Sequence, residues 1–112
     1  MQISARQSAA GTIFDITGDI DLAHSTQMRK ALLGEIKEKQ TRKVFLNLRN
    51  VPYIDSSGIA SLVEGLKASR DMGSRLILFG LSPSVREVME LSRLQKIFET
   101  YESEEQALAA KG

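Results

Sequence analysis

The chain has 112 residues, of which 42% are hydrophobic and 26% are charged, as is ordinary for a globular protein that folds as one domain. Its 15 Lys and Arg residues nearly balance 14 Asp and Glu residues, and a net charge of +1 gives no general attraction for nucleic acid. There is no cysteine, which excludes disulfides and thiolate metal sites. We therefore expect a single domain over residues 1–112.

The apolar segments of the chain are short. Residues 1–6 lack the long apolar stretch of a signal peptide, and the most apolar run, residues 76–79, is far too short to cross a bilayer. We therefore expect a cytoplasmic protein without direct membrane insertion, which a membrane-bound partner is still able to recruit.

The first 17 residues predict two strands. Ile3, Ala5 and Gln7 alternate with polar neighbours, and residues 12–17 resume the pattern after a break at Gly11. Two such runs around a short connection indicate an antiparallel hairpin. The second run leads into residues 18–21, which are rich in turn formers.

Residues 25–40 predict a helix. Met28, Leu32 and Ile36 recur every four residues, and charged side chains occupy the other side, which we interpret as solvated surface. The next segment, residues 44–48, is short and almost wholly apolar, as is typical of a strand that is buried on both faces of a sheet.

A second amphipathic helix follows a loop and the turn at residues 55–58. Its apolar residues recur at the spacing i, i+3, i+4, i+7, and we expect it to run to about Met72, with Gly73 ending it in the left-handed conformation. Residues 75–79 are the next buried strand.

The last third of the chain predicts three more elements. Ser82 and Pro83 are a capping residue and a first-turn proline for a third helix, with an apolar side of Val85, Val88 and Met89. Residues 95–101 predict a short strand, and Ser103 begins a capping box for a terminal helix.

The order β-β-α-β-α-β-α-β-α predicts an α/β fold. We expect one domain with a mixed, mostly parallel sheet of about four to five strands, packed with about four α-helices.

The usual chemical motifs of an enzyme are missing from the sequence. There is one histidine, no cysteine and no glycine-rich phosphate loop of either common type, so a Cys-His dyad or a His-Cys metal cluster cannot be built. His24 is a side chain able in principle to act as a base for a serine, but a polar residue that helps to cap the first helix is the simpler interpretation. We therefore expect no enzyme, no catalytic residue, no metal and no cofactor.

The segment Asp55-Ser56-Ser57-Gly58 is the one candidate site. It lies between a buried strand and a helix, which places it at the carboxyl edge of the sheet, where α/β proteins tend to bind ligands and partners. Asp55 and Ser56 are good helix caps, and Gly58 permits another backbone to approach closely. Ser57 falls in the first helical turn with an exposed hydroxyl. The simplest interpretation is a serine-rich cap and nothing more.

The functional interpretation is that the Ser57 hydroxyl accepts a phosphate. Phosphorylation adds roughly −1.5 to −2 charges at pH 7 beside Asp55, and beside Asp19 and Asp21 if their loop reaches the same edge. The helix dipole offsets about 0.3–1 kcal/mol of that cost, so the domain should stay folded. A partner packed on this edge would meet a desolvated dianion and dissociate.

In this setting the sequence resembles the STAS family, which includes anti-sigma factor antagonists and the tails of sulfate transporters. The resemblance covers nearly the whole chain. Its signs are residues 17–21, residues 44–48, residues 51–59, Gly73 before residues 76–78, and then Pro83, Val85, Leu94, Ile97 and Phe98.

The resemblance implies a stand-alone anti-sigma factor antagonist. In such relatives, the serine before the glycine, here Ser57, is phosphorylated by an anti-sigma factor that is also a serine kinase of the histidine-kinase-like ATPase fold. The unphosphorylated antagonist binds the kinase and frees the sigma factor, and a metal-dependent serine phosphatase removes the phosphate. Asp55 matches the acidic residue of the motif, and Asp21 matches an acidic position in the loop after the second strand. Ser56 ranks second as the acceptor.

We therefore expect the partner-binding residues to be the following: Asp19, Asp21, Asp55, Ser56, Ser57 and Gly58.

Other functions remain open. One is an accessory STAS subunit of a lipid-transport ATP-binding-cassette importer, and another is a partner-switching regulator in a system without a sigma factor. A nucleotide-binding or hydrolysing enzyme is a weaker alternative, because the sequence shows neither a phosphate loop nor a suitable base.

Overall fold

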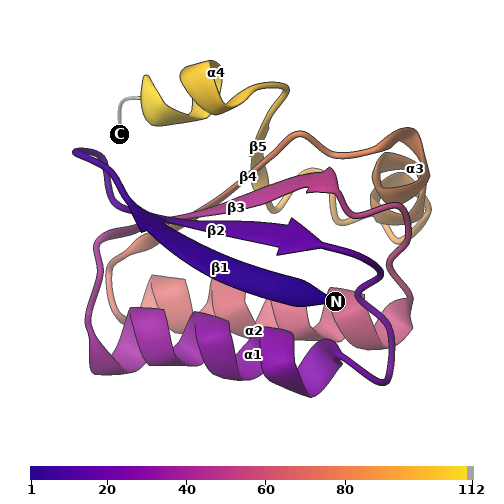
Figure 1. The fold of residues 1–112 in the computed structure, drawn as a ribbon, viewed down its shortest axis with the longest axis horizontal. Helices are drawn as coiled ribbons and strands as arrows, with labels where there is room; N and C mark the ends of the chain where they lie inside the picture. Colours follow the sequence, from indigo (N-terminus) through magenta and orange to yellow (C-terminus); the bar gives the residue numbers. More distant parts are fainter. Residues whose placement is uncertain (111–112) are drawn as a thin grey trace.

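The computed structural model describes residues 1–110, which form one five-stranded sheet (Figure 1). The strands are β1 (Gln2–Gln7), β2 (Thr12–Thr17), β3 (Lys43–Asn50), β4 (Arg75–Phe79) and β5 (Glu99–Tyr101). Their order in the sheet is that of the sequence. β1 and β2 form the antiparallel hairpin, and the pairs β2–β3, β3–β4 and β4–β5 are parallel.

The helices cover the two faces of the sheet unequally. They are α1 (Ser25–Leu33), the π-helix η1 (Gly34–Glu38), α2 (Ser56–Asp71), α3 (Pro83–Leu91) and α4 (Glu104–Leu108). Figure 1 shows α1 and α2 beneath the sheet and α4 above it. α3 lies at the end toward which β2 and β3 point, so it flanks the carboxyl edge of the sheet.

Two hydrophobic cores follow from this arrangement. The large core contains inward residues of all three central strands together with buried residues of α1, η1, α2 and α3. The small core lies on the opposite face and contains Ile13, Phe45, Ile77 and Phe79 beneath Ala107 of α4. Because both faces of β3 are covered, its apolar run is buried on both sides, as the sequence predicts.

The predicted element order and fold class are confirmed within the described residues. The caps are also in place: the Ser82 hydroxyl accepts a hydrogen bond from the Val85 N–H, and Ser103 accepts one from Gln106. Gly73 has φ +67° directly after α2, which is the left-handed conformation that glycine adopts without penalty.

Two predicted elements differ from those observed. The helix expected over residues 25–40 ends as the π-helix η1, whose wider turn directs both Glu35 and Ile36 into the interior. The strand expected over residues 95–101 is wrong for its first four residues. The N–H groups of Ile97 and Phe98 both bond back to the carbonyl of Leu94, so this stretch is a turn, and only Glu99–Tyr101 pairs with β4.

Candidate functional site

Two loops meet at the carboxyl edge of the sheet, one after β2 and one after β3. Ile20 and Ile54 form an isolated parallel bridge between the loops. The Ile20 N–H donates to the Tyr53 carbonyl at 3.0 Å, and the Asp55 N–H donates to the Ile20 carbonyl at 3.2 Å. The structure thus brings the loop that carries Asp19 and Asp21 against the Asp-Ser-Ser-Gly turn.

Asp55 connects the two loops at this junction, where Ile20 meets Ile54, through hydrogen bonds to both of its carboxylate oxygens. It is the N-cap of α2, where Oδ1 accepts the Gly58 N–H at 3.0 Å, while Oδ2 accepts the Leu22 N–H of the other loop at 3.1 Å. Such a cap satisfies donors that have no partner inside the helix. Asp55 therefore has a structural role of its own, whatever it does for a partner.

Gly58 is required by the close approach of the same two loops. A Cβ atom at this position would lie 2.3 Å from the Ile20 carbonyl oxygen and 2.6 Å from Cγ1 of Ile54. Real contacts are never this short, so glycine is the residue that lets α2 begin against the Ile20 loop. The structure thereby confirms the close approach that the sequence predicts at this position.

Ser56 and Ser57 occupy the first turn of α2 and differ in exposure. Ser56 is exposed, whereas Ser57 is half-buried and lines an open groove of about 240 Å³ between α1 and α2. The groove is lined by the following residues: Ser25, Thr26, Arg29, Ser57, Ala60, Ser61 and Glu64. Ser57 is therefore outside the core but less exposed than the sequence predicts, and Ser56 is the more exposed of the two residues.

Several residues that line this groove contact one another, within α2 and between α1 and α2. The Ser61 hydroxyl donates to the Ser25 carbonyl, 2.9 Å away, and also lies 3.2 Å from the Ser57 carbonyl. Further along, Nη1 of Arg29 lies 3.3 Å from Oε2 of Glu64, and about half of each of these side chains is exposed. From the sequence alone, the charged side of α1 is interpreted as solvated surface, and nothing in that pattern indicates that Arg29 lines the same groove as Ser57.

The acidic loop residues differ in their surroundings. Asp19 is exposed, whereas Asp21 is half-buried and its Oδ1 lies 2.7 Å from Nδ1 of His24. This hydrogen bond from His24 holds the pKa of Asp21 below its usual value. His24 does occupy the N-cap position of α1, but its side chain makes no capping bond, because it is turned toward Asp21. His24 is also not among the residues that line the Ser57 groove.

Two exposed apolar side chains flank the junction. Leu22 is 75% exposed and Tyr53 is 49% exposed, and each lies in one of the two loops that meet at Ile20 and Ile54. Tyrosine is among the residues that are enriched in protein interfaces, so these two side chains are available for contact with a partner. Neither residue stands out in the sequence, because their exposure depends on how the loops pack.

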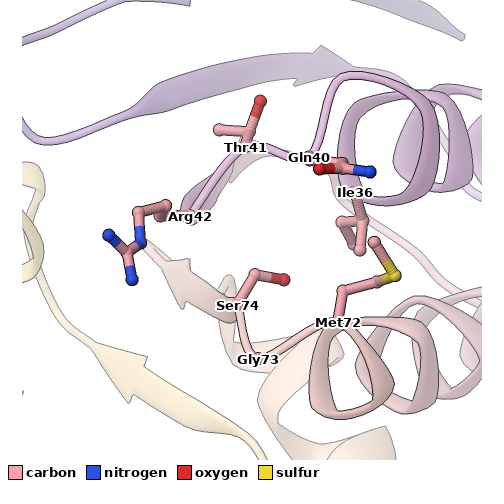
Figure 2. Close-up of a pocket in the computed structure, with 7 residues that line it drawn as sticks. All are labelled: Ile36, Gln40, Thr41, Arg42, Met72, Gly73 and Ser74. Carbon is pink, nitrogen blue, oxygen red and sulfur yellow. The ribbon is translucent and has the colours of Figure 1, made fainter.

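Another hollow lies at the opposite edge of the sheet and contains none of the predicted site residues. Figure 2 shows it between the end of η1, the segment before β3 and the turn after α2, with Gln40, Thr41 and Ser74 among its lining residues. Within residues 1–110, no three His, Asp or Glu side chains lie close enough together to hold a metal ion. In the same range, no helix has the length and apolar character needed to span a membrane.

Comparison with known protein families identifies the family of this chain. The family model described as the STAS domain matches residues 2–107. The chain belongs to the STAS family. Among curated STAS relatives, BtrV of Bordetella bronchiseptica, described as a candidate anti-sigma factor antagonist, is 34% identical over 85% of this chain and 81% of its own length. The anti-sigma F factor antagonist of Paenibacillus polymyxa is 26% identical over 96% of this chain and 92% of its own.

Solved structures share the STAS fold closely. An anti-sigma-factor antagonist domain protein from Planctomyces limnophilus has a TM-score of 0.85 and 24% identity, over 95% of this chain and 94% of its own. The Bacillus protein SpoIIAA in its phosphorylated form has a TM-score of 0.73 and 20% identity, covering 96% of each chain. At these identities the likeness establishes the fold alone.

Proposed function

We propose that the chain is an anti-sigma factor antagonist switched by phosphorylation of Ser57. The observation that carries the proposal is the position of Ser57, which lines an open groove from the first turn of α2, at the edge where two loops meet. Two comparisons support it: curated relatives are named anti-sigma factor antagonists, and SpoIIAA, which shares the fold, has been solved both unphosphorylated and phosphorylated.

The physical basis of the switch is local electrostatics. A phosphate on Ser57 adds about −1.5 to −2 charges at pH 7, near a helix N-terminus that favours negative charge by about 0.3–1 kcal/mol. The Asp55 carboxylate accepts hydrogen bonds from two backbone N–H groups, and these bonds between the two loops remain when Ser57 is phosphorylated. The domain stays folded, and the added negative charge changes the affinity for a partner that packs on this edge.

A partner on this edge would contact Leu22 and Tyr53 around the Ser57 groove. Bringing a hydrated dianion into such an interface costs several kcal/mol unless the partner supplies matching cations. The unphosphorylated form therefore binds, and the phosphorylated form dissociates. Asp19, Asp21, Ser56 and Gly58 belong to the same proposed surface.

The proposed partner is an anti-sigma factor that is also a serine kinase of the histidine-kinase-like ATPase fold. Binding releases the sigma factor, phosphorylation of Ser57 ends the binding, and a serine phosphatase restores it. In this proposal the chain acts in the cytoplasm as a regulator rather than an enzyme, and it needs neither cofactor nor nucleic acid.

The test compares Ser57→Ala with Ser57→Asp in binding to the cognate kinase. The alanine variant should bind as tightly as the unphosphorylated protein, and the aspartate variant should bind at least tenfold more weakly. The same two changes at Ser56, one residue away in the same helical turn and on the same proposed surface, give the comparison: the Ser57 pair should differ in affinity by more than the Ser56 pair. Equal affinity of the two Ser57 variants would overturn the proposal, as would phosphate mapped by mass spectrometry to Ser56 alone.

A further inference from the structure

The groove that contains Ser57 also contains one opposed pair of charges. Along α2, Ser57, Ser61 and Glu64 follow one another at i, i+4 and i+7, so they share one face of the helix. Along α1, Ser25 and Arg29 are four residues apart and line the same groove. Both helices follow strands of the parallel part of the sheet and therefore run in the same direction, side by side (Figure 1).

The ion pair between Arg29 and Glu64 leaves the guanidinium available to another partner. Only one pair of atoms is in contact, at 3.3 Å, and the side chains are 46% and 48% exposed. Exposed pairs of this kind contribute about 0–1 kcal/mol. Helical side chains also lean toward the N-terminus of their helix, which for α1 is the end nearest Ser57.

We propose that Arg29 is the intramolecular receptor for a phosphate on Ser57, and that Glu64 holds Arg29 while the serine is unmodified. The inference rests on the proposed phosphorylation of Ser57. A phosphate dianion carries more charge than a carboxylate and accepts two parallel N–H bonds from a guanidinium, so it outcompetes Glu64 for Arg29. The acidic groups on the two loops that meet at this edge are Asp19, Asp21 and Asp55, of which Asp55 is bound by two backbone N–H groups and Asp21 by His24.

This exchange of ion-pair partners extends the effect of phosphorylation along the groove between α1 and α2. In the unmodified protein the groove contains a neutral pair, Arg29 with Glu64. In the phosphorylated protein Arg29 moves toward position 57, and the Glu64 carboxylate, two helical turns away, is left without its cation. A partner that covers the α1–α2 groove therefore meets changed charges at both ends of the groove, rather than at the serine alone.

The test uses full-length protein with phosphoserine genetically encoded at position 57 and follows the phosphate by ³¹P NMR during a pH titration. Arg29→Gln should raise the second pKa of the phosphate by about half a pH unit or more, since a contacting opposite charge commonly shifts a pKa by 1–3 units. Lys30→Gln is the matched control, because it removes the same charge from the neighbouring residue of α1, which does not line the Ser57 groove. Glu64→Gln should lower the pKa by freeing Arg29.

Equal shifts in the Arg29 and Lys30 variants would overturn the inference, because they would show a general charge effect without contact. An Arg29 Nε chemical shift that is the same with serine and with phosphoserine at position 57 would overturn it as well. No kinase takes part in this experiment. Failure of the proposed function would therefore appear in the binding assay and leave these pKa differences in place.

Discussion

At the residue scale, the site depends on how closely two loops approach each other. Gly58 sits under the Ile20 carbonyl, and Asp55 ties the Leu22 N–H to the first turn of α2. Both residues hold the serine-bearing turn in place before any partner is considered. A variant at either position therefore tests the architecture of the site, whereas a variant at Ser57 tests its chemistry.

Gly58→Ala should destabilise the domain by roughly 1–3 kcal/mol, the usual cost of forcing extra volume into a packed interior. The added Cβ would lie 2.3 Å from a backbone carbonyl oxygen, which cannot move without separating the two loops. Gly34→Ala is the matched control, because nothing lies within 4 Å of a Cβ there and the backbone is helical. Alanine at position 34 should leave stability unchanged or raise it by up to about 1 kcal/mol.

Urea unfolding followed by circular dichroism measures both glycine variants. If Gly58→Ala unfolded at the same urea concentration as Gly34→Ala, the close approach of Ile20 and α2 would not be a constraint in solution.

At the element scale, η1 holds a buried carboxylate at the edge of the sheet opposite Ser57. Glu35 is 4% exposed. Its Oε2 accepts hydrogen bonds from the hydroxyls of Thr12 and Thr41, and its Oε1 lies 3.6 Å from the Lys39 ammonium. Burial alone would raise the pKa of Glu35, but the hydrogen bonds and the ammonium outweigh burial and hold the pKa below its usual value. Glu35 thereby connects η1 to β2 and to the segment that enters β3.

Glu35→Gln should lower the free energy of unfolding at neutral pH by about 1–3 kcal/mol, because an amide cannot accept all of these bonds. Since the folded pKa lies below the unfolded value, the contribution of the ionised form is complete above about pH 4.3. It is lost as the pH falls through the folded pKa. The stability difference between wild type and variant should therefore shrink in acid. Glu38→Gln, an exposed change in the same element, should cost less than about 0.5 kcal/mol.

Chemical unfolding at a series of pH values between 2 and 7 measures this difference. Two stability curves that run parallel over the whole range would show that Glu35 titrates with the same pKa in the folded and unfolded states. Asp15 also has a lowered pKa, chiefly because of its hydrogen bond with Arg6, so the comparison with the variant is needed to isolate Glu35.

The elements that the sequence predicts well are those whose signal is local. The apolar period of α2, the Ser82 cap and Gly73 depend on near neighbours, and all three predictions are confirmed. The buried Glu35 of η1 accepts hydrogen bonds from two threonines, and one of these, Thr12, is 23 residues away along the chain. No local pattern contains that information. The strand prediction for the stretch before β5 is wrong for a similar reason. Phe98 is buried in the large core from a turn, and its apolar character does not indicate a strand.

For the candidate site, the sequence predicts the turn but not its surroundings. The spacing of Asp55, Ser57 and Gly58 indicates a cap, an exposed hydroxyl and a close approach. The structure shows the cap and the close approach, whereas Ser57 is half-buried. Arg29 lies 28 positions before Ser57, on a helix whose charged side gives no sign of which residue faces α2. Only the packing of α1 on α2 shows that Arg29 and Ser57 share one groove.

At the scale of the whole molecule, the two faces of the sheet are protected very differently. The face toward α1 and α2 has a large core that three helices and η1 share. On the other face, Ile13, Phe45, Ile77 and Phe79 depend on α4, a helix of five residues. Short helices form in proteins only through tertiary packing, so α4 remains in place because Ala107 and its neighbours bury apolar surface. The small core is therefore the weak point of the domain.

Ala107→Asp should destabilise the domain by about 3 kcal/mol, because Ala107 is fully buried and an unpaired carboxylate there must lose its hydration or displace α4. If α4 is displaced, four large apolar side chains of the sheet become exposed. The variant should then bind the dye ANS under native conditions and show a lower melting temperature. Ala109→Asp adds the same charge to an exposed residue of the same segment and should leave both readings near those of the wild type. If Ala107→Asp melted like Ala109→Asp and bound no dye, the small core would not depend on α4.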